Sequence, residues 1–222
     1  MMKFISRLVL VVMVLILVGC VAPSAAKYDY SRFRSESPRS VLIVPVVNRS
    51  LDVDAPDYFL SSISVPIAER GYYIFPVNLV KRVMADDGLS DADMVHTNDP
   101  VRLAELFGAD SVLYVSIERW DAQYAVFATS VTVQLSYQLK SGKTGEVLWN
   151  NDQTVVYSPQ NSSSGNPLVD LIAAAVVAAV QKAAPNYMPL ARQANFRATY
   201  QLGHGLPAGP HDSQYLTDTE AF

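Results

Sequence analysis

The 222-residue chain contains a single cysteine, Cys20, and three histidines. With one thiol it can form neither an internal disulfide nor a cysteine-rich metal site. Its net charge of −4 lacks the basic excess that proteins need to neutralise nucleic-acid phosphates. These absences exclude a domain that is held together by disulfide bonds, and they argue against a nucleic-acid partner. The fold must therefore be held together by its core, and half of the residues are hydrophobic.

The apolar run over residues 8–18 is too short to span a bilayer, which takes about 20 apolar residues. The run follows Lys3 and Arg7 and ends in Leu17-Val18-Gly19-Cys20. A basic segment, an apolar segment and a small-residue cleavage site, in that order, indicate a secretory signal peptide. The last four residues resemble the lipobox of bacterial lipoproteins. We therefore predict cleavage before Cys20, a diacylglyceryl group on its thiol, an N-acyl chain such as palmitate, and no other cofactor.

The residue after the lipidated cysteine bears on the destination of the protein. Val21 stands where an aspartate would signal retention in the inner membrane. We therefore expect a lipid anchor in the outer membrane, with the body facing the periplasm or the cell surface. Loss of Lys3 and Arg7 with the signal peptide lowers the net charge from −4 to −6. Acyl chains, rather than attraction to anionic lipid, must then hold the protein at the membrane.

Composition divides the chain into four segments. We predict a signal peptide at residues 1–19, a lipidated tether at 20–39, one α/β domain at 40–200 and a flexible tail, rich in Gly, Pro and His, at 201–222. Tyr28, Tyr30 and Phe33 in the tether either contact the membrane interface or pack onto the domain.

Hydrophobic periodicity predicts an α/β (α+β) sandwich, in which a mixed sheet of about five strands is flanked by helices. The run at residues 40–47 indicates a strand covered on both faces, and strict alternation at 126–140 indicates a strand with one wet face. Asp99 and Pro100 begin a helix that Gly108 ends. The expected strands are 40–47, 72–77, 111–120, 126–140 and 146–157, and the expected helices are 55–70, 79–87, 100–107 and 168–184.

No motif carries catalytic chemistry. Lys143-Thr144-Gly145 and Ser24-Ala25-Ala26-Lys27 match two penicillin-binding signatures, but the serine lies in the tether and the third signature is missing. His204 and His211 lack zinc-site spacing, and the Asp52 loop lacks the glycine and glutamate of a calcium loop. We therefore predict a protein that is not an enzyme and has no metal ligand.

Two segments are candidates for interaction. The helix expected at 168–184 is apolar all round, so either its own sheet or a partner must bury it. Its candidate contact residues are Leu171, Ile172, Val176, Val177 and Val180. The hairpin at 126–157 alternates as a soluble sheet does, or as one hairpin of an oligomeric membrane pore would.

Several short stretches resemble one family of bacterial lipoproteins of uncharacterised role, which includes a neisserial surface-lipoprotein vaccine candidate. They are Tyr28-Asp29-Tyr30, Pro38-Arg39-Ser40, Asn48-Arg49-Ser50, Gly71-Tyr72-Tyr73 with Pro76, and Gly108-Ala109-Asp110. The likeness covers residues 20–190, with Pro45-Val46 where a Pro-Pro pair is expected. It implies a fold like the N-terminal domain of TolB, related to curli-secretion-type lipoproteins. It also implies other envelope lipoproteins as partners and supplies no catalytic residues.

These observations predict an outer-membrane lipoprotein that acts as a non-enzymatic binding or assembly component of an envelope complex of the transport or secretion type, and that can also self-associate. An oligomeric membrane-inserting pore component and a small periplasmic hydrolase are the alternatives.

Overall fold

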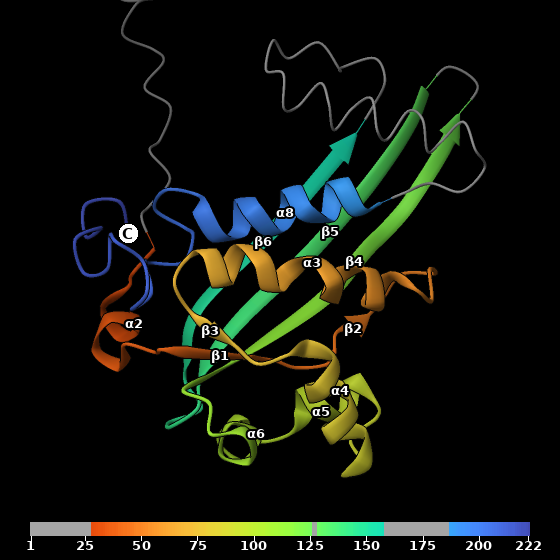
Figure 1. Ribbon diagram of the computed structural model, residues 1–222. Coiled ribbons are helices and arrows are strands. Elements are labelled where there is room, and N and C mark those ends of the chain that lie inside the picture. The colour runs from red at the N-terminus through yellow and green to blue at the C-terminus, as the bar shows by residue number, and fades with distance from the viewer. Residues whose placement is uncertain (1–27, 126–127, 158–186) are drawn as a thin grey trace, which may run out of the picture.

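The structure is a computed structural model that describes residues 28–125, 128–157 and 187–222 (Figure 1). Its strands are β1 (Ser40–Ile43), β2 (Val47–Asn48), β3 (Tyr73–Ile74), β4 (Ser111–Ala125), β5 (Ala128–Ser141) and β6 (Val147–Tyr157). Its helices are α2 (Ser31–Glu36), α3 (Ala55–Glu69), α4 (Val77–Asp86), α5 (Ala92–Thr97), α6 (Pro100–Phe107) and α8 (Met188–Tyr200). No helix among these residues is both long and apolar enough to cross a membrane.

The strands form one mixed sheet in the order β3-β1-β4-β5-β6, and β2 also pairs with β4. β1 runs parallel to β3 and β4, whereas β4, β5 and β6 form an antiparallel meander. The predicted α+β sandwich with a mixed sheet is confirmed. The sheet has six strands instead of about five, because the expected strand at 40–47 is interrupted at Pro45. Proline has no N–H for the ladder, so β1 ends before it and β2 resumes pairing with β4 beyond it.

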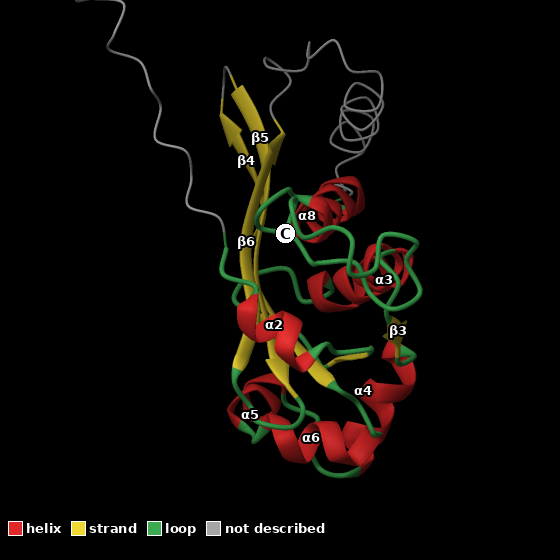
Figure 2. Cartoon of the chain, turned by 90° about the vertical axis from the view of Figure 1, so that its left-hand side faces the viewer, coloured by secondary structure: helices red, strands yellow, loops and turns green. Residues whose placement is uncertain are grey.

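Helices cover both faces of the sheet at β1, so the β1 side chains are buried in either direction. Val41 and Ile43 belong to the larger core cluster, which includes the inner residues of α3 and α8. Leu42 and Val44 belong to a second cluster with residues of α4, α5 and α6. Figure 2 shows the sheet edge-on, with α3 and α8 beside it and α5 and α6 at one end. This two-sided burial explains the continuous apolar run of β1.

The long hairpin keeps its predicted alternation. On β5 the apolar face is fully buried, at Val131, Val133, Leu135, Tyr137 and Leu139. The Tyr137 hydroxyl donates to Asn195 Oδ1 of α8 (2.6 Å), and the Asn195 amide donates to Ser62 Oγ of α3 (3.0 Å). The apolar face that the pore alternative would turn toward lipid is therefore occupied by the protein's own helices.

Local signals placed some helix ends correctly and others wrongly. At α6 the Asp99 side chain accepts from Val101 N, Pro100 is the first helical residue, and Gly108 adopts φ 69° as the left-handed C-cap, as predicted. The helix expected at 79–87 begins two residues earlier, because α4 starts at Val77 with Pro76 as its N-cap. Helices α2, α5 and α8 were not predicted.

The structure corrects both ends of the predicted domain. The expected tether overlaps the body, because Tyr30 and Phe33 are buried in the main core. Of the two roles considered for these aromatics, packing onto the domain is the one observed. The expected flexible tail at 201–222 is wrong as well, because Leu206, Ala208 and Asp218 are buried. Polar partners supplied by distant elements hold this Gly/Pro-rich segment, as described next.

Candidate functional site

The first and last described segments of the chain meet in what we call the terminal junction, residues 28–39 and 201–222. Tyr28 N donates to Gly203 O (3.0 Å), and the Tyr30 hydroxyl donates to Gly205 O (2.7 Å). The Tyr72 hydroxyl, from beside β3, donates to Pro207 O (2.7 Å). Burial raises the pKa of the Tyr30 and Tyr72 phenols well above the usual value near 10. Both therefore stay protonated and donate at any physiological pH.

A buried ion cluster closes the terminal junction. One oxygen of Asp218 accepts from Arg34 (2.6 Å), and the other accepts from Arg70 (3.0 Å) and from Ala208 N (2.6 Å). Arg70 also donates to Asp212 (3.3 Å) and to the Leu206 carbonyl (2.9 Å). The side chains of Arg70 and Asp218 are only 4% and 3% exposed. Each charge is thus compensated inside the protein, as buried charges require.

No local sequence signal identifies this cluster. Arg70 ends one helix and Asp218 lies in a segment rich in Gly and Pro, 148 positions further on. Only the fold brings them together.

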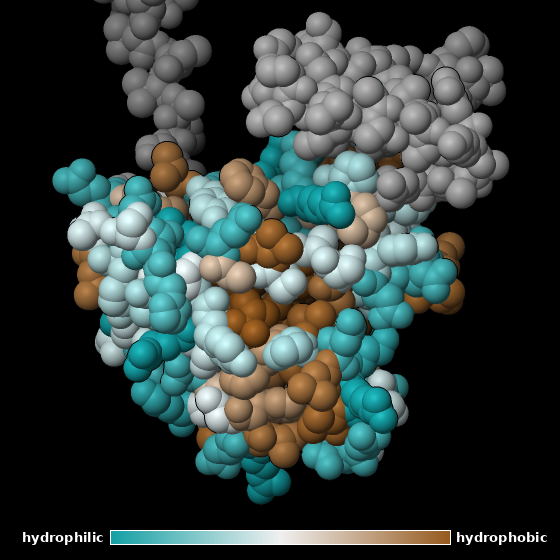
Figure 3. Space-filling model, viewed as in Figure 1, coloured by the Kyte–Doolittle hydropathy of each residue, from teal (hydrophilic) through white to brown (hydrophobic). Residues whose placement is uncertain are grey.

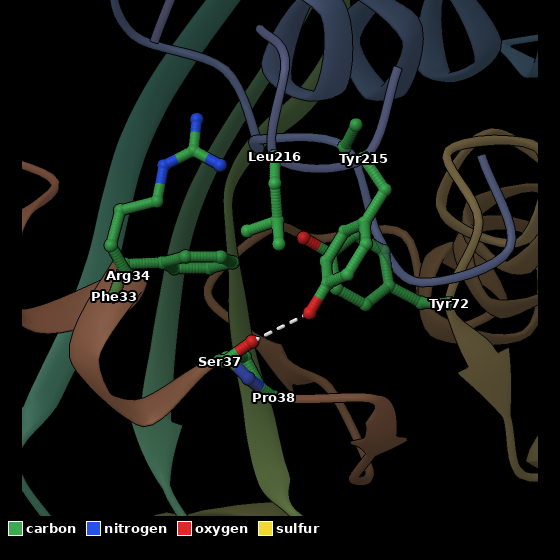
Figure 4. A pocket seen from close by; sticks show the side chains of 8 residues that line it. Phe33, Arg34, Ser37, Pro38, Tyr72, Tyr215 and Leu216 are labelled. Carbon is green, nitrogen blue, oxygen red and sulfur yellow. Dashed lines mark hydrogen bonds between the residues drawn. The ribbon is translucent and has the colours of Figure 1, made fainter. Parts of the chain in front are cut away.

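A narrow cavity lies within the terminal junction (Figure 4). Leu216 points into it between Phe33 and Tyr215, and the Tyr215 and Ser37 hydroxyls lie 2.8 Å apart. Ser37 (φ 45°) and Leu216 (φ 60°) are the non-glycine residues with positive φ in the described chain. The cavity volume is about 10 Å³, which holds at most one water. We therefore assign the cavity to the packing of the two segments and not to a ligand.

The β3 edge of the sheet carries a row of aromatic residues, which we call the edge patch: Tyr73, which is exposed, and Phe75 and Phe107, which are half-buried. The ring centroids of Tyr73 and Phe75 are 5.1 Å apart, and those of Phe75 and Phe107 are 6.2 Å apart. Tyr73 is 55% exposed, and Leu79 and Leu106 on the adjoining helices are also exposed. Figure 3 shows hydrophobic residues gathered over β3 and the start of α4, with a hollow between them and α3.

The sequence-predicted sites fall outside the described residues. These are the lipobox Leu17, Val18 and Gly19 with Cys20, and the apolar set Leu171, Ile172, Val176, Val177 and Val180. They remain predictions. The edge patch was missed because Tyr73 and Phe75 look like alternating strand residues, and the sequence does not show that β3 is an edge strand.

The histidines and acidic residues of the described chain form no candidate metal site. Within residues 28–125, 128–157 and 187–222, no three His, Cys, Asp or Glu side chains are grouped closely enough to hold a metal ion. His204 offers its backbone carbonyl to the Trp149 and Asn151 side chains, and its ring has no assigned role. Asp52 and Asp54 make local turn contacts, and Asp57 pairs with Lys81 on the surface.

His96 should make stability depend on pH. Its Nε2 lies 3.0 Å from the Pro45 carbonyl, and its ring meets Tyr114 edge-on. Burial lowers its pKa, helped by Lys140 and Arg49 and opposed by the Pro45 hydrogen bond and Asp93. The unfolded chain therefore binds a proton at His96 more readily than the folded chain does. The neutral ring stabilises the fold above about pH 6.5, and this stabilisation is lost as the pH falls through the lowered pKa of the folded state.

We expect His96→Gln to flatten the dependence of urea-unfolding midpoints on pH between about 7 and 5. The same change at exposed His211 should leave this slope as in the wild type, and equal slopes for all three proteins would contradict the prediction.

Comparison with known proteins gives a consistent result. The model of a protein family described as "Putative lipoprotein GNA1162-like" matches residues 28–211. The protein described as "Putative lipoprotein NMB1124/NMB1162" of Neisseria meningitidis serogroup B is 32% identical in an alignment of 202 residues that covers 89% of this chain and 92% of that protein.

A solved structure agrees with this likeness. The crystal structure of lipoprotein GNA1162 from Neisseria meningitidis matches with a TM-score of 0.55 and 31% identity, covering 65% of this chain and 99% of that chain. A PelC dodecamer from Paraburkholderia phytofirmans matches at a TM-score of 0.39 and 16% identity, over 60% of this chain and 78% of that chain. A match at that level supports no inference about function or assembly.

Proposed function

Because the chain belongs to the GNA1162-like lipoprotein family, we propose that it is anchored in the outer membrane through Cys20 and acts as a non-enzymatic binding component of an envelope complex. The lipobox sequence Leu17-Val18-Gly19-Cys20 supplies the attachment point. The body supplies the binding surface.

The short distance along the chain between anchor and body supports this role. Only residues 21–27 separate Cys20 from Tyr28, and Tyr28, the first residue of the terminal junction, is hydrogen-bonded to Gly203. Fully extended, this stretch reaches roughly 28 Å at about 3.5 Å per residue. The anchor therefore holds the body close to the membrane and raises its effective concentration for partners in the same membrane.

The observation that carries the proposal is the edge patch. Aromatic residues are enriched in protein interfaces, and an uncovered sheet edge is a place where another chain can pair. Tyr73 combines both properties, since it belongs to edge strand β3 and is 55% exposed. A partner that covers the ring series Tyr73–Phe75–Phe107 would bury apolar surface that this chain leaves in water.

Crosslinking in intact cells tests the proposal. A photo-crosslinking residue placed at Leu106, beside the edge patch, should capture a discrete envelope protein. The product should be lost with Cys20→Ala, which removes the lipid, and with Tyr73→Asp, which places a charge in the interface. Tyr58→Asp is the matched control, because Tyr58 is similarly exposed, at 48%, but lies on α3; it should leave the product intact. Only self-crosslinked species, or a product that persists with Tyr73→Asp, would overturn the proposal.

A further inference from the structure

A second surface feature, at the other edge of the sheet, is a groove between α8 and β6. Five residues line it, and we call it the α8–β6 groove: Gln153, Phe196, Arg197, Tyr200 and Gln201. Its volume is about 440 Å³, within the range of roughly 300–1,000 Å³ that is typical of small-molecule sites. The sheet order separates β6 from the edge patch on β3. The groove is therefore independent of the surface used in the proposed function.

One wall of the groove consists of two aromatic rings that stack on each other, so that the outer face of Phe196 is the aromatic face open to a ligand. Phe196 and Tyr200 lie one helical turn apart on α8, with ring centroids 4.6 Å apart and an interplanar angle of 26°. Phe196 is 56% exposed, so its ring contributes little to the core. The Tyr200 ring also lies 5.6 Å from the Arg70 guanidinium, which the buried ion cluster fixes in place. The wall is thus preorganised, which reduces the entropy lost on binding.

The floor of the groove is polar, and some of its hydrogen-bonding groups already have partners within the protein. The Gln153 side-chain amide donates to Asn151 Oδ1 (2.6 Å) and to Gln201 Oε1 (3.0 Å). Both N–H donors of Gln153 are then used and its carbonyl oxygen remains an acceptor, whereas Gln201 keeps its two amide donors. The Arg197 guanidinium, on the exposed side of α8, forms no ion pair with any described residue.

These groups together favour one class of ligand. The negative face of an aromatic ring attracts the C–H groups on the flat side of a pyranose ring. Side-chain amides donate to and accept from hydroxyl and acetamido groups. A guanidinium prefers a carboxylate, to which it can donate two parallel hydrogen bonds. A purely apolar ligand would leave the two glutamines without partners, at a cost in binding energy.

We propose that the α8–β6 groove binds a glycan segment whose pyranose rings carry carboxylate groups. The sugar ring stacks on the outer face of Phe196, its hydroxyl and acetamido groups bond to Gln153 and Gln201, and its carboxylate pairs with Arg197. Two sources share this chemistry: muramic-acid-containing fragments of the cell wall and uronic-acid oligosaccharides.

Calorimetric titration of the detergent-solubilised, lipidated protein tests the proposal. Four probes are compared: a muramyl-containing disaccharide, a galacturonic acid trimer, a neutral glucose trimer and an acidic hexapeptide. We expect at least one of the two acidic sugars to bind with a Kd below about 1 mM and the neutral sugar to bind roughly tenfold more weakly. Whichever acidic sugar binds more tightly identifies the source. No binding of either acidic sugar at about 10 mM, or equal affinity for the hexapeptide, would overturn the proposal.

Variants at exposed positions localise the site without disturbing the core. Phe196→Ala should weaken both acidic and neutral sugars roughly tenfold, and Arg197→Gln should weaken only the acidic sugar, also roughly tenfold. Arg192→Gln on the same helix and Tyr58→Ala on α3 are the matched controls, because both residues are exposed outside the groove. They should change the affinity by less than about twofold. Wild-type affinity in both groove variants would place the glycan elsewhere and overturn the assignment.

Discussion

Replacing Asp218 with asparagine is expected to lower the free energy of unfolding by about 3–5 kcal/mol. Asparagine keeps the shape of the side chain but removes the charge that faces Arg34 at 2.6 Å and Arg70 at 3.0 Å. Arg70 would then lie buried with only Asp212 as a charged partner, at 3.3 Å. Leaving a buried charge without its counter-charge is among the costliest single substitutions. For a domain of this size the melting temperature should fall by roughly 6–20 °C.

Glu146→Gln is the matched control for this measurement. It breaks the Arg32–Glu146 pair, which has a similar separation of 3.3 Å but side chains that are 52% and 54% exposed. Exposed pairs contribute only about 0–1 kcal/mol, so this melting curve should nearly coincide with that of the wild type. If Asp218→Asn unfolded at the same temperature as Glu146→Gln, the ion cluster would not be coupled to folding.

Replacing Gly71 with alanine should cost about 2–5 kcal/mol, since two penalties add: a left-handed backbone and overpacking. Gly71 has φ +90°, and a Cβ there would lie 2.4 Å from Asp212 N and 2.9 Å from Gly209 O. Both are backbone atoms of the terminal junction, so the 201–222 segment must move away. Chymotrypsin cleavage after Tyr215 should therefore accelerate in this variant together with the loss of stability.

Gly88→Ala separates the two penalties. Gly88 has φ +80°, and a Cβ there would meet no atom within 4 Å. Only the cost of the left-handed backbone then applies, about 1–2 kcal/mol, and Tyr215 should stay protected. Equal losses of stability in the two variants would show that the close approach of Gly71 to residues 209–212 does not constrain the segment.

Part of this fold could be predicted because local signals and tertiary contacts agree. The alternation of β5 marks a face that α3 and α8 do bury, and the Asp99–Pro100 start and Gly108 end of α6 are set by backbone hydrogen bonds within a few residues. Such features depend on residues that are close together in the chain, so they can be predicted from a single sequence.

Other parts could not be predicted because their partners are distant. α8 buries small residues such as Ala191, Ala194 and Ala198 against the sheet, which gives no strong hydrophobic period. Residues 201–222 have the composition of a loose tail, yet the hydroxyls of Tyr30 and Tyr72 and the charge of Arg70 supply the partners that fix them. The edge patch and the α8–β6 groove depend on which strands end at the sheet edges, and spacing along the chain does not encode that.

The ion cluster also affects the order in which parts of the fold can form. Arg70 and Arg34 meet Asp218 across 148 and 184 positions of the chain, so the ion cluster cannot be completed before residue 218 is in place. Closing such long-range contacts is slow because the intervening chain must first be ordered. The terminal junction should therefore be among the last parts of the described fold to form, after the local hairpin contacts of β4, β5 and β6.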